Sequence, residues 1–104
     1  MVSLKEILPA YWIGEEIGHG ARSVVHEVKR KSDGQRFAAK FVPVREDADL
    51  EIIRHLENEH EILKALHTEA SPGARLIVEP VEMLTVRRWF KTLAACHVME
   101  YAPG

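Results

Sequence analysis

Hydrophobic and polar residues in the first half of the chain follow the two-residue period of β-strands. One strand is predicted over residues 11–17 and a second over 23–29, where three valines favour extended backbone. Asp33-Gly34 is a strong signal for a tight turn, and a third strand is predicted over 36–42. The chain is therefore expected to begin with three strands.

The third predicted strand has two chemically different faces. Because side chains alternate along a strand, Phe37, Ala39 and Phe41 are expected on one face, and Ala38 and Lys40 on the other. The lysine is thus expected beside a small residue on its own face.

A helix is predicted from residue 46 to about 66. Four acidic residues near its start suit the positive end of the helix dipole: Glu46, Asp47, Asp49 and Glu51. A loop at 71–73 and two extended segments, near 81–86 and 93–99, complete the pattern. This order predicts an α+β domain, in which one helix packs on a five-stranded antiparallel sheet.

The helix carries a carboxylate on its predicted apolar stripe. The apolar residues of the stripe recur at helical spacing and are Ile52, Leu56, Leu63 and Leu66. Glu59 falls among them, where an unpaired buried charge is costly. Either Glu59 lies at the edge of the stripe and reaches water, or a cation faces it, for which Lys40 is the candidate.

Composition limits the class of protein. The 104 residues suffice for one small domain, and a net charge of -2 gives no electrostatic reason to expect nucleic acid or an anionic membrane. The single Cys96 rules out an internal disulfide framework. The first residues lack the long apolar stretch that is typical of a signal peptide, and the sequence contains no apolar run of the roughly 18 residues that span a bilayer. A soluble, cytoplasmic domain is expected.

The turn after the first strand is rich in small residues. Residues 17–25 read Ile-Gly-His-Gly-Ala-Arg-Ser-Val-Val, which would let backbone N–H groups approach a phosphate closely. A dinucleotide-binding turn, with a helix directly after the glycines, and a β-turn without ligand are alternatives. A Walker-type loop is excluded because no Gly-Lys-Ser/Thr follows.

Four motifs in order resemble the small lobe of protein kinases. Gly18-x-Gly20-x-x-Ser23-x-Val25 is similar to the hairpin that covers the phosphates of ATP, and Phe37-Ala38-Ala39-Lys40 to the third-strand lysine motif. Asn58-Glu59-His60-Glu61 resembles the helix whose glutamate pairs with that lysine. Residues 97–104 are similar to the fifth strand and hinge of a Ser/Thr kinase. The resemblance covers residues 11–104 and leaves 1–10 as an N-terminal extension.

The resemblance implies roles for these positions. Lys40, held by Glu59, would contact the α- and β-phosphates of ATP, and Met99 would be the gatekeeper. The phosphate-covering loop would consist of Gly18, His19, Gly20, Ala21, Arg22 and Ser23. The residues that sandwich or hydrogen-bond the adenine would be Ile17, Val25, Ala38, Glu100 and Ala102. Ser23 replaces the third glycine, and Arg22 stands where an aromatic often caps the loop.

The resemblance also implies that the catalytic lobe is absent. The sequence holds no His-Arg-Asp loop and no Asp-Phe-Gly motif, so ligands for Mg²⁺ would have to come from elsewhere. The expected function is an ATP-binding small lobe that transfers no phosphate alone and is covered by a partner protein or a second lobe. The alternative is a non-catalytic interaction module that retains the fold.

Several other residues carry weaker signals. His55 and His60 are five apart and do not share a helix face, and no His-Glu-x-x-His spacing occurs, so no metal site is predicted. Cys96 lies in an apolar strand and is expected in the core. Arg87-Arg88-Trp89 is either a docking patch or a solvated hairpin end.

Overall fold

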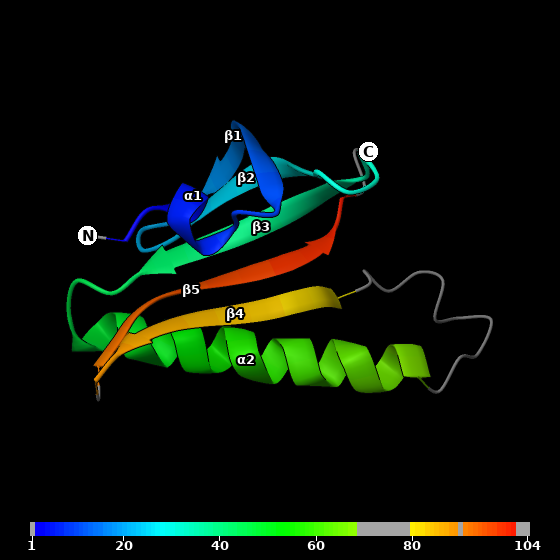
Figure 1. Cartoon of the computed structure of the whole chain (residues 1–104). Helices are drawn as coiled ribbons and strands as arrows, with labels where there is room; N and C mark the ends of the chain where they lie inside the picture. Colours follow the sequence, from blue (N-terminus) through cyan, green and yellow to red (C-terminus); the bar gives the residue numbers. More distant parts are fainter. Residues whose placement is uncertain (1, 69–79, 90, 102–104) are drawn as a thin grey trace.

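The computed structural model describes residues 2–68, 80–89 and 91–101 (Figure 1). The described elements, in chain order, are α1 (Leu4–Ile7), β1 (Tyr11–His19), β2 (Val24–Arg30), β3 (Arg36–Pro43), α2 (Asp47–Thr68), β4 (Pro80–Arg88) and β5 (Lys91–Glu100). The strands form one antiparallel sheet in the order β1-β2-β3-β5-β4. The predicted fold class is therefore confirmed.

The predicted strands and helix all appear, with bounds that differ from the prediction by at most two residues. The Asp33-Gly34 turn is present, with Gly34 at φ 73°, a backbone conformation that glycine adopts without strain. The predicted loop at 71–73 lies outside the described residues. The short helix α1, which the sequence analysis did not predict, is capped by Ser3, whose hydroxyl accepts a hydrogen bond from the Glu6 amide.

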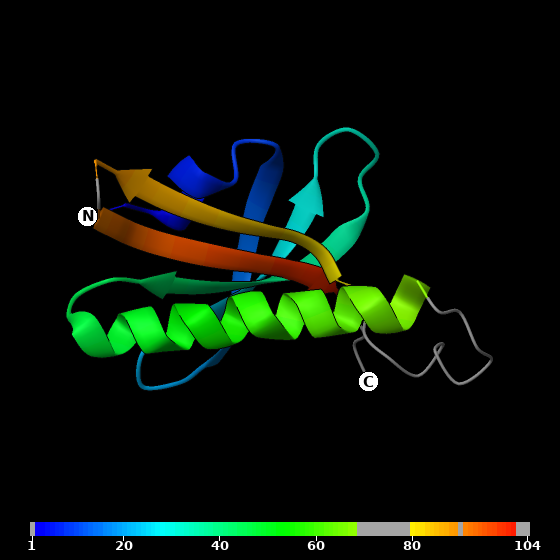
Figure 2. The same ribbon diagram turned by 90° about the horizontal axis from the view of Figure 1, so that it is seen from below.

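The sheet has a different core on each face. On one face, α1 packs against a cluster that includes Phe37, Ala39 and Phe41. On the other, Val42 and Ala95 pack against Ile53 and Leu56 of α2. Figure 2 shows α2 running lengthwise beneath the sheet, where it contacts β3, β4 and β5. The two faces predicted for the third strand are confirmed.

Helix α2 is rotated relative to the predicted stripe. Leu66 is 42% exposed and Glu59 is exposed, whereas Ile53 and Leu56 are buried. The stripe that faces the sheet runs through Asp49, Ile53, Leu56 and His60, again at helical spacing. Glu59 is therefore not on the buried stripe, and the residue after it, His60, takes the inward position.

Asp49 joins the start of α2 to two other segments. Its carboxylate Oδ2 accepts hydrogen bonds from the backbone N–H groups of Arg45 at 2.8 Å and Glu46 at 3.0 Å, in the manner of a capping box. Its Oδ1 lies 3.2 Å from Nη1 of Arg22, which also pairs with Glu46. These amide and guanidinium donors, the Arg45 amide foremost, hold the pKa of the buried Asp49 carboxyl below its usual range.

Cys96 lies in the core, as the sequence analysis predicted. Cys96 is buried in the sheet, and burial, together with the nearby Glu82 carboxylate, raises its thiol pKa to about 12. Arg87, Arg88 and Trp89 lie exposed at the β4–β5 turn, with Trp89 88% exposed. This exposure fits both alternatives for the segment, a docking patch and a solvated hairpin end, so each stays a prediction.

We predict that Asp49→Ala lowers the free energy of unfolding by about 1–2 kcal/mol, because it removes the side-chain cap of α2 and leaves two backbone donors without that acceptor. Urea denaturation measures the loss. Asp47→Ala, at an exposed position in the same helical turn, is the matched control and should lower the free energy of unfolding by only about 0.3 kcal/mol. Equal losses in the two variants would contradict the capping role of Asp49.

Candidate functional site

One row of residues crosses the whole sheet on the face that α2 covers in part. Across successive strands, Gly18 pairs with Val25, Val25 with Lys40, Lys40 with His97, and His97 with Met83. Directly paired residues in antiparallel strands place their side chains on the same face. The strand pairing therefore aligns the glycine-rich hairpin with Lys40 and with His97, on the face of the sheet where α2 packs.

Two residues of the predicted adenine pocket, Ala38 and Met99, lie in the neighbouring row. Ala38 pairs with Met99 across β3 and β5, on the same face as Lys40. Ala38 is buried, Val25 and Met99 are half-buried and Ile17 is 42% exposed. Glu100 is exposed at the end of β5, and Ala102 lies outside the described residues. The sheet thus gathers Val25, Ala38, Lys40 and Met99 on one face.

The glycine-rich segment is the turn of a β-hairpin. β1 ends at His19 and β2 begins at Val24, with the Gly20 amide donating a hydrogen bond to the Ser23 carbonyl at 2.8 Å. No helix follows the glycines, so the dinucleotide-binding alternative is wrong. Around the turn, His19, Gly20 and Ala21 are exposed, whereas Gly18, Arg22 and Ser23 are partly buried.

Two glycines of β1 differ in what the fold requires of them. A Cβ added at Gly14 would lie 2.8 Å from the carbonyl oxygen of Glu27, so packing within the sheet demands glycine there. Among the described residues, a Cβ at Gly18 would meet only the Val25 Cβ, at 3.9 Å, which is an ordinary contact. Internal packing therefore does not explain the glycine at position 18.

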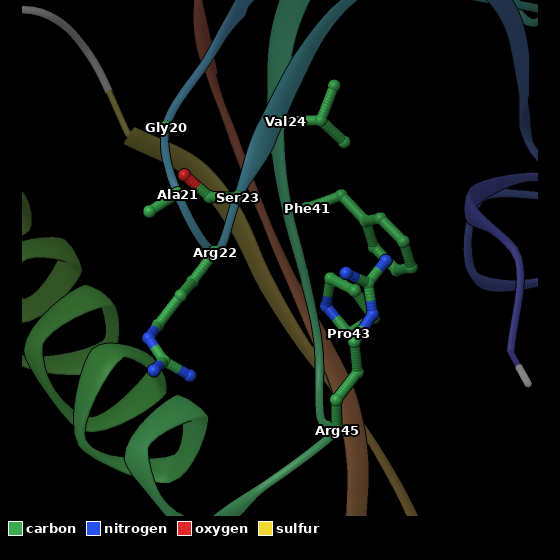
Figure 3. A pocket seen from close by; sticks show the side chains of 8 residues that line it. All are labelled: Gly20, Ala21, Arg22, Ser23, Val24, Phe41, Pro43 and Arg45. Carbon is green, nitrogen blue, oxygen red and sulfur yellow. The ribbon is translucent and has the colours of Figure 1, made fainter.

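A hollow of about 220 Å³ lies against the same hairpin, on the other side of the sheet (Figure 3). The strand residues that line it are Val24, Phe41 and Pro43. Side chains alternate along a strand, so these residues lie on the opposite face of the sheet from Val25 and Lys40. In Figure 3 the side chain of Arg22 points from the turn toward α2, where it pairs with Asp49. This hollow does not coincide with the predicted nucleotide face.

Lys40 and Glu59 are on the same side of the sheet but do not form an ion pair within the described part of the chain. Both lie close enough to His97 to act on it electrostatically. Lys40 is partly buried beside His97, whereas Glu59 is exposed on α2. The structure thus places the Lys40 ammonium and the Glu59 carboxylate near the same residue, His97, without an ion pair between them among the described contacts.

A buried histidine pair, which the sequence analysis did not identify, occupies the space between α2 and Lys40. His97 is fully buried, with its Nε2 3.1 Å from Nδ1 of His60 and the rings perpendicular, at 85°. Nδ1 of His97 has no hydrogen-bond partner among the residues that the structure describes. Burial first, then the His60 and Lys40 charges, lowers the pKa of His97, and only Glu59 acts in the opposite direction.

We predict that stability falls on acidification from about pH 7 toward pH 5. Because the pKa of His97 is lower in the folded chain than its ordinary value of 6.5, the unfolded chain binds the extra proton first. The contribution of His97 is present above pH 6.5 and is lost as the pH falls toward the folded pKa. The limiting slope is about 1.4 kcal/mol per pH unit for one proton.

Urea denaturation at a series of pH values measures this slope. His97→Leu should flatten this slope, whereas His55→Gln, at an exposed position of α2, should leave it unchanged. A wild-type slope in His97→Leu would show that another group carries the pH dependence.

Comparisons with known proteins identify the fold. No family model matches the chain. The autoinhibited serine kinase domain of the giant muscle protein titin superposes on 93% of this chain with a TM-score of 0.63 and 22% sequence identity. The twitchin kinase region from C. elegans covers 91% with a TM-score of 0.60 and 27% identity. Rad53 in complex with AMP-PNP covers 94% with a TM-score of 0.60 and 25% identity.

The matched proteins are much longer than this chain, which spans 26%, 14% and 22% of their respective lengths. The shared part consists of the antiparallel sheet and its packed helix, which are the elements that the sequence motifs predicted. The chain therefore has the fold of the small, amino-terminal lobe of a Ser/Thr protein kinase.

Proposed function

We propose that this chain is an ATP-binding small lobe, and that it binds the nucleotide on the sheet face that carries Lys40. The observation that carries the proposal is the row from Gly18 through Val25 to Lys40, which puts a hairpin of small residues and a cation on one line. Backbone N–H groups and an ammonium are the donors that phosphate oxygens require.

The absence of a packing reason for Gly18 supports the same proposal. The fold leaves room for a side chain there, so the glycine is better explained by a ligand that approaches the backbone closely. In this proposal Gly18, Gly20 and Ser23 cover the phosphates, with His19, Ala21 and Arg22 completing the loop, and Lys40 contacts the α- and β-phosphates with help from Glu59.

The adenine would lie between the apolar side chains of Ile17, Val25 and Ala38, with Met99 as the gatekeeper. Its polar edge would bond to the Glu100 carbonyl and the Ala102 amide. Rad53, a protein of the same fold, was solved with AMP-PNP. This supports a nucleotide as the ligand class for the shared lobe.

The described residues contain no group of three or more His, Cys, Asp or Glu side chains that could hold a metal ion. Mg²⁺ would therefore arrive with the nucleotide and take its remaining ligands from a second lobe or a partner protein, which would also cover the open face. We propose that residues 11–104 form the lobe and 1–10 an extension of it. The proposed role is nucleotide binding, with phosphate transfer dependent on the covering partner.

The setting proposed for this lobe is a reducing, cytoplasmic compartment, which suits a buried and unpaired Cys96. No helix in the described ranges is long and apolar enough to cross a membrane.

A second candidate is a non-catalytic interaction module. The observation that favours it is the exposure of Glu59. Because Glu59 points to solvent, it does not hold the Lys40 ammonium in place for contact with a phosphate. The binding experiment below separates the two functions.

We predict that ATP binds with a dissociation constant on the order of 10⁻⁴ M or weaker, because only one side of the nucleotide is covered. Titration calorimetry with the purified chain measures it. Lys40→Met should weaken binding about tenfold, and Lys31→Met, at an exposed position in the β2–β3 turn, should not. Equal affinity for all three proteins would contradict the site, and no binding at all would favour the interaction module.

We predict that Gly18→Ala leaves the free energy of unfolding within about 0.5 kcal/mol of wild type but weakens ATP binding severalfold. The added methyl group meets no close neighbour in the described part of the chain, yet under this proposal it stands where a phosphate would approach. Gly14→Ala is the opposite control, since its Cβ would crowd the Glu27 carbonyl and should destabilise the fold. Unchanged affinity in a stable Gly18→Ala variant would exclude a close approach at this position.

A further inference from the structure

The turn that joins β4 to β5 carries an exposed tryptophan in a backbone conformation that does not suit it. Arg88 pairs directly with Lys91, so the chain reverses between them, at the end of the sheet where α2 begins (Figure 1). Trp89 has φ 60°, in the left-handed region where glycine and asparagine are favoured and a bulky residue is strained. The residue is 88% exposed. Neither the backbone nor packing among the described residues therefore explains a tryptophan at position 89.

The two cations that flank the turn are also unfavourable for the fold. Because Arg88 and Lys91 lie directly opposite each other in an antiparallel pair, their side chains share one face, where like charges repel. Both residues are exposed, and neither belongs to any ion pair that the described residues form. An anionic group bound between them would remove this repulsion.

The same residues line a hollow of about 420 Å³. Its lining consists of Arg88, Trp89, Lys91 and Leu93. Leu93 is half-buried, and its carbonyl accepts a hydrogen bond from the Val44 amide at 2.9 Å, which fixes the backbone at this end of β5. None of the acidic residues at the start of α2 lines the hollow. The hollow therefore offers an indole ring and a leucine to an apolar group, with a guanidinium and an ammonium beside them for carboxylates.

We propose that this hollow is a docking site for an acidic segment of a partner protein. The segment inserts an apolar side chain against Trp89 and Leu93 and sets its carboxylates against Arg88 and Lys91. One ligand then accounts for both unfavourable features of the turn, the strained tryptophan and the paired cations. Tryptophan and arginine are also among the residues that most often dominate the affinity of protein interfaces. The docking site is independent of the proposed nucleotide site.

The charge balance of the chain favours an acidic peptide over an anionic membrane. Without Arg88 and Lys91, the net charge of -2 becomes -4, so the rest of the chain would be repelled by a bilayer surface rich in anionic lipid. A short segment contacts only the hollow, and charges farther away than about 8 Å are largely screened at physiological ionic strength. A hollow also holds an inserted side chain, which a bilayer surface does not provide.

Charge reversal at the turn tests the electrostatic half of the site. The probe is a synthetic peptide that carries one phenylalanine between pairs of glutamates, titrated by calorimetry into the purified chain. We expect a dissociation constant on the order of 10⁻⁴ M. Arg88→Glu should weaken binding about tenfold yet lower the unfolding equilibrium constant, because it replaces a repulsive cross-strand pair by an attractive one. Arg87→Glu, at the next position and therefore on the other face of β4, is the matched control and should keep most of the affinity.

Trp89→Asn separates docking from folding. Asparagine tolerates a positive φ, so this variant should lower the unfolding equilibrium constant about threefold in urea denaturation while it abolishes peptide binding. Trp12→Phe, at another exposed tryptophan, is the control and should bind the peptide as wild type does. In the Trp12→Phe chain Trp89 is the only tryptophan, so a blue shift of its fluorescence on peptide addition reports its burial directly.

The proposal is overturned if the peptide does not bind at millimolar concentration, if a peptide with glutamines in place of the glutamates binds equally well, or if Trp89→Asn binds like wild type. A loss of stability in Trp89→Asn would overturn it too, since the tryptophan would then serve the fold. Cosedimentation with vesicles of phosphatidylserine and phosphatidylcholine that depends on Trp89, without peptide binding, would assign the hollow to a membrane instead. A doubling of the chain's mass in sedimentation that depends on Trp89 would assign it to a second copy.

Discussion

The pairing of β3 with β5 is the constraint on which the site depends. It puts Lys40 opposite His97 and Ala38 opposite Met99, and it fixes which side of each strand faces α2. A slip of one residue would exchange the faces and send Lys40 into the core formed with α1. The alternating burial of Phe37, Ala39 and Phe41 against that core opposes such a slip, so the register is fixed by packing on the far face.

The position of the glycine-rich hairpin is tied to that of α2. Arg22 extends from the turn to Asp49 and Glu46, and Asp49 also holds the backbone that enters the helix. The hairpin turn and the start of α2 are therefore joined through Arg22 and the carboxylates of Asp49 and Glu46. The Arg22 side chain, at a position where an aromatic would be expected from the resemblance, is engaged by this contact instead of covering the loop.

Much of this structure could be predicted from local patterns. Valine-rich segments, the Asp33-Gly34 turn and the acidic start of α2 each carry a local physical signal, and together they specified the elements and their order. The rotation of α2 could not be predicted, because Ile52 and Ile53 are adjacent and the apolar positions fit two stripes about equally. Leu63 and Leu66 favoured the stripe that contains Glu59, whereas Ile53 in the core with Val42, and His60 against His97, lie on the stripe that faces the sheet.

The contacts that decide the details join residues far apart in the sequence. His60 meets His97 across 37 positions, and Arg22 meets Asp49 across 27. Neither pairing leaves a periodic signal, and a histidine on a helix gives no indication of its partner until the sheet is assembled. The face that gathers Gly18, Val25 and Lys40 could be inferred only through the resemblance, because the ladder that aligns them is itself long-range.

The central claim is that a nucleotide binds on the Lys40 face of the sheet rather than in the hollow on the opposite face. Val24 and Val25 are adjacent in sequence but lie on opposite faces, Val25 beside Lys40 and Val24 beside Phe41. Methyl NMR of the valine-labelled chain titrated with ATP therefore separates the two faces in one experiment. We expect contacts between adenine protons and the Val25 methyl groups, with Val24 unaffected. Contacts to Val24, with Val25 unaffected, would place the ligand in the hollow and contradict the account.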